Sequence, residues 1–278
     1  MTQLIESTKE MLRDSRFLRK ALIIACPVAL QGMLNTLVNL VDTLMIGTLG
    51  ATAIAAVGLA NKVFFVFNLL IFGIVSGAGI LAAQFWGSGD IKGIRKVLGL
   101  SILMALGGAL FFVAPATLCP ELVMRIFTTS ASSIELGARY LRIAALTYPF
   151  IALTSVYVAM LRAVNKVVFP VISSCVAIML NIVLNYILIF GKLGAPALGV
   201  AGAAVATLIA RVLEICLIIA YVYRKKLPLA CGPADLFGWS KRFVRQFAIT
   251  AAPVIANEFM WGLGTTLYSL AYLSLIHI

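Results

Sequence analysis

The chain has 278 residues, of which 62% are apolar and only 12% are charged, and its formal net charge is +12. Soluble domains carry roughly 45–50% apolar and about 25% charged residues, so this chain lacks the polar surface of a water-soluble fold. These figures exclude a disordered chain, a nucleic-acid-binding module and a disulfide scaffold. The unbroken apolar runs also exclude a membrane β-barrel, whose lumen face is polar at every second residue. The composition indicates an all-α polytopic membrane protein that contacts the lipid bilayer and no nucleic acid.

Seven segments are long and apolar enough to cross a membrane as helices, which takes about 20 residues. In chain order they are Ala21–Ile46, Ala53–Phe85, Val97–Leu118, Ala138–Leu161, Val167–Phe190, Val200–Tyr223 and Phe243–Leu273. Residues 1–16 precede them and are either an amphipathic helix on the membrane surface or a solvated leader. The connections are short except for residues 224–242, which we interpret as a linker between two units.

Basic residues collect on alternate loops. Of the 22 lysines and arginines, 16 lie before the first span or after the second, fourth and sixth: Lys9, Arg13, Arg16, Arg19, Lys20, Lys92, Arg95, Lys96, Arg162, Lys166, Arg224, Lys225, Lys226, Lys241, Arg242 and Arg245. Loops rich in lysine and arginine stay on the cytoplasmic side of a membrane. The pattern therefore predicts a cytoplasmic N-terminus.

Cysteine and histidine offer little chemistry in this chain. No two of the five cysteines form a CxxC pair, so we interpret them as packing residues. The one histidine, His277, leaves no His-based metal centre and no catalytic triad. An intramembrane enzyme needs paired catalytic groups, yet Asp42 is the only aspartate in the predicted spans. We therefore predict neither an enzyme nor a resident cofactor, and the lack of a repeated filter motif argues against a channel.

The chain contains an internal repeat. Residues 16–28 match residues 242–254 at a constant offset of 226, and seven of the thirteen positions are identical, with Pro27 and Pro253 among them. Six spans return the chain to the side on which it began, so a second copy starts with the same orientation as the first. This arrangement is the parallel repeat found in some transporters.

The repeat divides the chain unequally. Residues 17–223 are predicted to form a six-helix lobe, and residues 243–278 the first helix of a second lobe. Two full copies would span about 450 residues. We therefore expect a truncated reading frame, in which Ser274–Ile278, without glycine or charge, are a foreign tail.

Asp42 is the first candidate functional residue, because ionisable groups within lipid are costly and usually functional. It lies about one turn from the end of the first span. One interpretation is a carboxylate at the membrane interface that reaches water. The other is a cation or proton site inside the bundle, where a desolvated carboxylate can take up a proton and a bound cation would hold it ionised.

Asn181 and Asn185 lie four residues apart in the fifth span and so share one helix face. Their amide oxygens could coordinate Na⁺ or orient a proton-carrying carboxylate, and the alternative is ordinary hydrogen bonding between helices. Thr207 in the sixth span can add a hydroxyl. Together with Asp42, these residues form the predicted coupling-ion site, and Na⁺ at Asp42 is the only metal ion considered.

Other polar residues in the spans have mixed interpretations. Glu258 lies near the middle of the seventh span with no adjacent base and is a further coupling candidate. Arg211 and Glu214 are three residues apart and are predicted to form a structural ion pair. Gly73 and Gly77 predict close helix packing. Lys62 either lines a central cavity or pairs with a carboxylate.

Several sequence blocks resemble the multidrug and toxic compound extrusion (MATE) family. The blocks are Pro27-Val28 with Gln31, Leu37 to Thr43 through Gly47, Leu49-Gly50-Ala51, Ala55 to Gly58, Leu161-Arg162-Ala163, Asn181 to Asn185 and Gly199 to Ala204. The resemblance extends to about Tyr272, and the block around Asp42 is the most specific. Asn185 departs from the branch of the family that has aspartate there, which leaves the coupling ion open.

The resemblance implies twelve helices in two six-helix lobes around a central cavity. It implies export of small amphiphilic or cationic substrates in exchange for Na⁺ or H⁺, in the cytoplasmic (inner) membrane of a bacterium, by a full-length monomer. Family members bind the coupling cation at a first-span aspartate, here Asp42, with fifth-span polar residues and a sixth-span threonine. Glu258 matches a seventh-span glutamate of the Na⁺-coupled bacterial branch.

A second transport hypothesis is a flippase for a lipid-linked sugar or another lipid precursor of the same superfamily. Such a protein would favour a more cationic cavity, to which Lys62, Arg139 and Arg142 could contribute.

Overall fold

The computed structural model describes residues 15–276, and within this range it contains helices and no strand. The elements are α2 (Ser15–Gly47), α3 (Ala51–Gly87), α4 (Ile91–Leu118), α5 (Pro120–Arg125), α6 (Ala131–Ala144), the 3₁₀ turn η1 (Ala145–Thr147), α7 (Tyr148–Ala163), α8 (Val168–Phe190), α9 (Val200–Arg224), α10 (Pro233–Leu236) and α11 (Lys241–Ile276). The predicted all-α fold is confirmed. Almost all of the predicted leader, residues 1–14, and the tail residues 277–278 lie outside the described residues.

Six helices in the described range are long and apolar enough to cross a membrane, and they correspond to the first six predicted spans. The fourth is a continuous rod, 131–163, in which α6 and α7 join through η1. The seventh predicted segment is also helical, as α11, but is not among these six. The short helices α5 and α10 were not predicted, because a helix of one turn leaves no hydrophobic period to detect.

Local sequence explains where several helices begin and end. The Asp90 side chain accepts a hydrogen bond from the backbone N–H of Gly93 at 2.9 Å and so caps the N-terminus of α4. Gly191 ends α8 with φ +67°, a left-handed conformation that favours glycine. Pro120 begins α5, where a missing N–H costs nothing.

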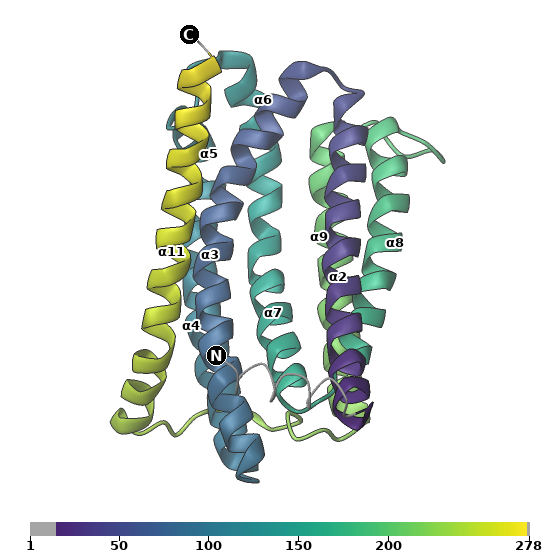
Figure 1. Cartoon of the computed structure of the whole chain (residues 1–278). Helices are drawn as coiled ribbons and strands as arrows, with labels where there is room; N and C mark the ends of the chain where they lie inside the picture. Colours follow the sequence, from purple (N-terminus) through teal and green to yellow (C-terminus); the bar gives the residue numbers. More distant parts are fainter. Residues whose placement is uncertain (1–14, 277–278) are drawn as a thin grey trace.

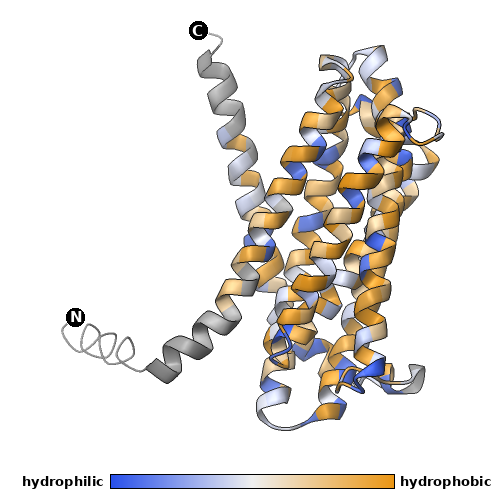
Figure 2. Cartoon of the chain, turned by 90° about the vertical axis from the view of Figure 1, so that its right-hand side faces the viewer, coloured by the Kyte–Doolittle hydropathy of each residue, from blue (hydrophilic) through white to orange (hydrophobic). Residues whose placement is uncertain are grey.

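The helices form two groups on either side of the rod made by α6 and α7 (Figure 1). On one side α3 packs against α4 and α11, and on the other α8 packs against α9 and α2. Apolar residues run along the length of the helices, and polar residues gather at their ends (Figure 2). Large apolar side chains such as Phe111 and Leu118 remain exposed on outer faces, as expected of a surface that lipid covers.

An aromatic cluster joins α3, α4 and α7 at the centre of the bundle. The rings of Phe67 and Tyr148 stack with centroids 4.6 Å apart, and Phe112 meets Phe67 edge-on at 5.8 Å. Phe67 is fully buried and Tyr148 nearly so. Aromatic pairs of this kind add about 0.5–1.5 kcal/mol beyond area burial, so this cluster fixes α3 against α7.

The predicted close packing of Gly73 and Gly77 is confirmed, and the partner helix is α11. A Cβ atom at Gly77 would lie 2.6 Å from the Cβ of Ala251, and one at Gly73 would lie 2.4 Å from Ile255 Cγ1. The backbones of α3 and α11 can therefore approach closely, because glycine has no side chain to keep them apart, as in other small-residue helix pairs. Among the described residues α3 is the main partner of α11.

Linker residues 225–240 fold back onto the N-terminal end of α4. The Arg95 guanidinium donates to the carbonyls of Pro228 and Ala230 at 3.1 and 3.2 Å, and it pairs with Asp235 at 3.2 Å. The Trp239 indole N–H donates to a carbonyl of α4, that of Lys96, at 3.1 Å. Residues 225–240, predicted to be a linker, therefore pack against the helix bundle at α4.

Apolar contacts secure the same segment. Leu229 is fully buried, and Cys231 is 7% exposed. The Tyr223 hydroxyl donates to the carbonyl of Cys231 at 2.8 Å. Burial raises the pKa of the Cys231 thiol, because the thiolate loses hydration.

We predict that Gly77→Ala destabilises the α3–α11 contact, whereas Gly79→Ala does not, since a Cβ at Gly79 meets nothing within 4 Å. Both changes gain the helix preference of alanine, but only Gly77→Ala forces a clash, which costs about 1–3 kcal/mol. Thermal unfolding of the purified chain in detergent measures the difference. Equal stability of the two variants would contradict the close approach.

We also predict that Arg95→Ala exposes Cys231 to maleimide. In a chain whose other four cysteines are replaced, the wild-type thiol should react slowly, because it is buried and its raised pKa keeps the thiolate fraction small. Loss of the Arg95 contacts should raise the labelling rate about tenfold or more, the effect of about 1.4 kcal/mol of easier opening. Lys92→Ala, an exposed site on the same helix turn, is the control.

Candidate functional site

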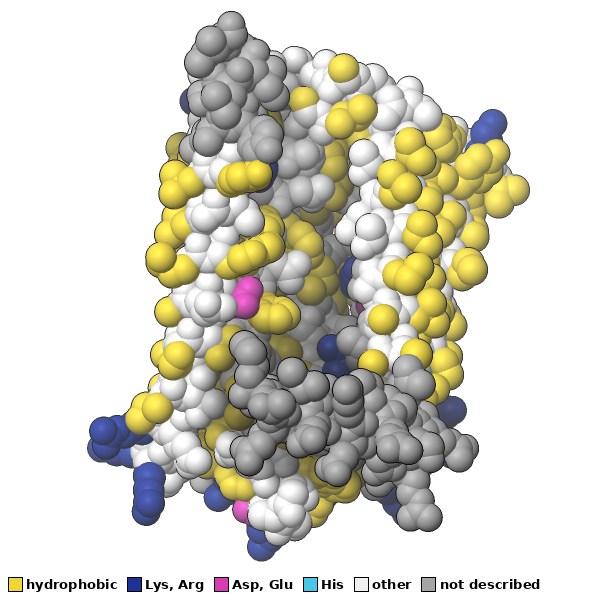
Figure 3. All heavy atoms as spheres, viewed as in Figure 1, with side chains coloured by type: hydrophobic (Ala, Val, Ile, Leu, Met, Phe, Trp, Pro, Cys, Tyr) yellow, Lys and Arg dark blue, Asp and Glu magenta, His cyan; other side chains and the backbone are white. Residues whose placement is uncertain are grey.

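A cavity of about 480 Å³ lies where α2, α3, α6, α7, α8 and α9 meet. A space-filling view shows the surface hollowed between the α11 side and the α2–α8 side (Figure 3). The walls of the cavity combine aromatic and polar side chains: Asn39, Asp42, Asn61, Phe64, Phe65, Asn68, Tyr140, Tyr148, Asn181, Thr207 and Arg211. A pocket that is mostly apolar with a few convergent polar groups is the usual form of a small-molecule site.

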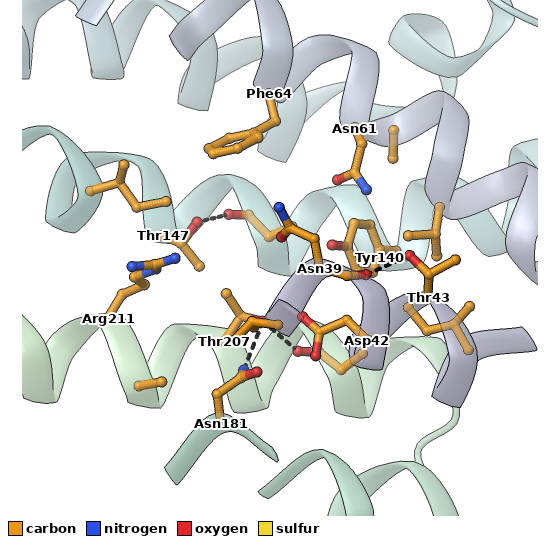
Figure 4. Close-up of a pocket in the computed structure, with 18 of the residues that line it drawn as sticks. Asn39, Asp42, Thr43, Asn61, Phe64, Tyr140, Thr147, Asn181, Thr207 and Arg211 are labelled. Atoms are coloured by element: carbon orange, nitrogen blue, oxygen red, sulfur yellow. Dashed lines mark hydrogen bonds between the residues drawn. The ribbon is translucent and has the colours of Figure 1, made fainter. Parts of the chain in front are cut away.

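Asp42, Asn181 and Thr207 line this cavity (Figure 4), and the fully buried Asn185 lies behind them, hydrogen-bonded to Asp42. We refer to these four residues as the carboxylate cluster. The Asn185 amide donates to Asp42 Oδ1 at 2.5 Å and to Asn181 Oδ1 at 3.2 Å. The Asn181 amide lies 3.2 Å from Thr207 Oγ1. Asn181 and Asn185 share one face of α8, as predicted, and so both can reach Asp42 on α2.

The Asn181 amide fits its surroundings in two orientations. Turned by half a rotation, its Nδ2 donates to Asp42 Oδ1 at 3.2 Å, and its Oδ1 accepts from the Thr207 hydroxyl and backbone N–H at 3.2 and 3.3 Å. The nitrogen and oxygen of an amide occupy nearly the same space. Asn181 can therefore offer either a donor or an acceptor to the Asp42 side.

One oxygen of the carboxylate cluster is left over. Asn185 is completely buried, and its Oδ1 has no hydrogen-bond partner in the described part of the chain. A buried polar atom without a partner costs about 1–3 kcal/mol, so such an atom beside a carboxylate favours an occupant that supplies positive charge. Oxygen atoms of Asp42, Asn181, Asn185 and Thr207 form a ligand set suited to a hard cation.

Charged and titratable groups approach Asp42 from two further helices. Arg211 on α9 lines the cavity, and its charge attracts the Asp42 carboxylate. The predicted pair with Glu214 is present, with 2.7 Å between Arg211 Nη1 and Glu214 Oε2. Tyr140 on α6 also lines the cavity. The site therefore holds one acid and one base that are not paired directly with each other.

Glu258 does not join this cluster. It lies partly buried on α11, outside the residues that line the cavity. Lys62 is exposed on α3, is not a lining residue and forms no ion pair with any described residue. Arg139 pairs with Glu135 at 2.8 Å on an exposed face. None of the three basic residues expected to make the cavity cationic, Lys62, Arg139 and Arg142, lines it, whereas Arg211 does.

Sequence reasoning missed three amides that line the cavity: Asn39, Asn61 and Asn68. Asn39 precedes Asp42 by almost one helical turn, and Asn61 and Asn68 are seven residues apart in α3, so each pair shares a face. This spacing was visible in the sequence. It was overlooked because an isolated asparagine in an apolar run resembles a packing residue.

These features define a polytopic helical membrane protein with a polar, carboxylate-bearing cavity between its helices. The MatE family model matches residues 27–187, and the chain belongs to this family. It is 33% identical over 196 residues to the probable multidrug resistance protein NorM of Thermotoga maritima, and covers 42% of that protein with 70% of its own length. With NorM of Synechocystis sp. it shares 30% identity over 257 residues, which is 89% of this chain and 54% of that protein.

Solved structures share the fold. A MOP superfamily transporter from Pyrococcus furiosus superposes with a TM-score of 0.79 at 23% identity over 89% of this chain and 54% of that chain. A structure described as the inward-facing conformation of a multidrug resistance MATE family transporter gives 0.72 at 25% identity, over 80% of this chain and 50% of that chain. The chain thus spans about half the length of the proteins it matches.

We predict opposite outcomes for two threonines, the partly buried Thr207 and the buried Thr154. Thr207→Val removes a hydroxyl that contacts Asn181 and should destabilise the chain by about 0.5–1 kcal/mol. Thr154→Val removes a buried hydroxyl that has no partner among the described residues, so its loss should be neutral or stabilising. Thermal unfolding in detergent compares them. A larger loss of stability for Thr154→Val than for Thr207→Val would contradict the hydrogen bond between Thr207 and Asn181.

Proposed function

We propose that this chain forms the N-terminal lobe of a secondary active exporter of organic cations and drugs, which antiports Na⁺ or H⁺. Membership of the MatE family supports the transporter class, and the relatives named as multidrug resistance proteins support the substrate class. The carboxylate cluster is the single observation that carries the coupling proposal. It places an acid, an amide and a hydroxyl on the wall of a cavity large enough for a small molecule, with a second, buried amide hydrogen-bonded to the acid.

Each member of the cluster has a proposed role. Asp42 takes up the coupling ion, and the free Oδ1 of Asn185 becomes a ligand when the ion is bound. Asn181 turns its amide oxygen toward a cation and its nitrogen toward a bare carboxylate. Thr207 supports either orientation through its hydroxyl. The cluster without an ion leaves Asn185 Oδ1 without a partner, and a bound ion would remove that cost.

The cavity has the chemistry for an amphiphilic cation. Phe64, Phe65 and Tyr148 supply apolar surface and aromatic faces, which attract cations, while Asp42 supplies negative charge. A coupling ion at Asp42 removes that charge. Ion uptake and drug release are then linked, because both ligands use one carboxylate.

The proposal includes an orientation and a partner lobe. The basic loops support a cytoplasmic N-terminus, and the bacterial relatives support a multi-pass protein of a bacterial inner membrane. A second six-helix lobe, beginning with α11, would complete a monomeric transporter whose lobes rock about a central cavity. Inward movement of a cation releases about 2.3 kcal/mol per charge for each 100 mV, which drives export.

Arg211 keeps a second function open. A cationic group in the cavity favours anionic substrates, so a flippase for a lipid-linked sugar is the alternative. The ion pair between Arg211 and Glu214 neutralises much of the positive charge of Arg211, and this favours the drug exporter.

We predict that Asp42→Asn abolishes energised efflux of a fluorescent organic cation in a two-lobe protein that carries this chain. The amide keeps the shape and loses the ionisable charge, so a tenfold or greater fall in efflux corresponds to about 1.4 kcal/mol or more of lost coupling. Glu258→Gln tests the residue outside the cavity in the same assay. Dependence of the rates on Na⁺ and on pH identifies the ion.

Glu135→Gln is the control, because it also neutralises one carboxylate but at an exposed ion pair. It should leave efflux within about twofold, since exposed pairs contribute little. Efflux that survives Asp42→Asn with unchanged ion dependence would contradict the proposed site. Transport of a lipid-linked sugar, without drug efflux, would support the flippase instead.

A further inference from the structure

A second network of polar residues connects four helices and reaches the cavity only at Arg211. Arg162 Nη2 donates to Gln31 Oε1 at 2.7 Å, and Gln31 Nε2 donates to Ser174 Oγ at 2.9 Å. The Ser174 hydroxyl donates to Glu214 Oε1 at 2.6 Å, and Arg211 donates to Glu214 Oε2 at 2.7 Å. We call these five residues the polar chain. It links α7, α2, α8 and α9.

The three central residues of the polar chain are buried and hydrogen-bonded, whereas Arg162 at one end is exposed and Arg211 at the other is partly exposed. Gln31, Ser174 and Glu214 are 9%, 3% and 2% exposed, and the described residues leave none of their side-chain oxygens or nitrogens buried without a partner. The carboxylate cluster, by contrast, has a free acceptor at Asn185. A saturated network has nothing left to bind a ligand, so its role is to hold helices in place.

The two networks attach α2 to α8 with the same spacing. Gln31 meets Ser174, and Asp42 meets Asn185, each across a separation of 143 residues in sequence. Eleven residues separate the two contacts on either helix, which is close to three turns and roughly 16 Å. Both contacts therefore lie on one face of each helix, and the two helices run parallel in a single register.

Apolar packing joins α2 to α8 and α9 at its C-terminal end, where Ile46 packs with Ile189 and Val200. Among the described side chains of α2, only Gln31 and Ile46 are buried. A helix held at few points changes its rotation or axial position when one point is lost. Because Arg211 ends the polar chain and also lines the cavity, the two networks share a charged group.

We propose that Gln31 and Ser174 are positioning residues for the coupling-ion site, which fix the rotation and register of α2 so that Asp42 faces Asn181 and Asn185. This inference rests on the proposed function, because it assigns the polar chain a role in ion binding at Asp42. Arg162 holds Gln31 at one end of the polar chain, and Glu214, paired with the terminal Arg211, holds Ser174. None of these four residues contacts the ion.

Ser174 and its neighbour Ser173 provide a matched test. Both are buried in α8, but the Ser173 hydroxyl donates only to its own helix, to the Pro170 carbonyl at 2.9 Å. Ser174→Ala and Gln31→Leu break the polar chain, whereas Ser173→Ala leaves it intact. The chain in detergent is melted at increasing Na⁺ with K⁺ balancing ionic strength, and at decreasing pH without Na⁺. An ion that binds the folded state raises the melting temperature as its concentration rises.

We expect the ion concentration for half of this stabilisation to rise at least about fivefold in Ser174→Ala and Gln31→Leu, roughly the effect of one lost buried hydrogen bond. In Ser173→Ala it should stay within about twofold. The ion response should vanish in Asp42→Asn, and adding Ser174→Ala to Asp42→Asn should change only the melting temperature without ion. This readout separates positioning from a general loss of stability.

Each other result is decisive. A wild-type melting temperature that responds to neither ion would overturn the Asp42 site and this inference with it. An ion response that Asp42→Asn abolishes, but that Ser174→Ala, Gln31→Leu and Ser173→Ala leave equally unchanged, would overturn only the positioning role.

Discussion

A polar side chain on a membrane helix must find its partner within the protein, because the hydrocarbon offers none. Helix α2 depends on this constraint more than its neighbours do. Its few buried side chains supply little apolar contact, and hydrogen bonds at Gln31 and Asp42 provide its polar attachment to α8. The position of α2 is therefore sensitive to charge. Neutralising Asp42 changes a directional hydrogen bond that holds α2 in place. An apolar contact has no such direction, so a change in one would alter the position of the helix less.

The opposite side of the lobe is built on shape. Phe67, Phe112 and Tyr148 lock α3, α4 and α7 through ring contacts, and Gly73 and Gly77 bring α11 directly against α3. Contacts of this kind do not respond to a proton or to an ion. The lobe thus combines a half that is insensitive to charge with a half that is held by charge, and the cavity lies between them (Figure 4).

The sequence was sufficient for the helices and for much of the candidate site. Apolar runs located the ends of the six spans within two residues and their starts within eight, because lipid imposes length and hydrophobicity directly. The convergence of Asp42, Asn181 and Asn185 was predictable from the cost of burying polar groups and from the spacing of the two asparagines. The family resemblance gave a second reason to include Thr207 in the site, and the family itself is confirmed.

The parts that could not be predicted are contacts between distant segments. Gln31, Ser174 and Arg162 gave no signal of a shared network, since a lone polar residue in a span does not reveal its partner. The fold of the linker depends on Arg95, whose carbonyl acceptors leave no trace in side-chain patterns. Glu258 was grouped with Asp42 by chemistry, yet α11 places it apart from the cavity.

The docked linker has a consequence for biosynthesis. Residues 225–240 find their partners on α4 and α9, in segments that have already left the ribosome when the linker emerges. Domains generally fold as units during synthesis, the N-terminal one first. The contacts of residues 225–240 with α4 and α9 can therefore form before α11 is translated. When α11 is made, it then packs on an α3 whose neighbouring helices are already in place.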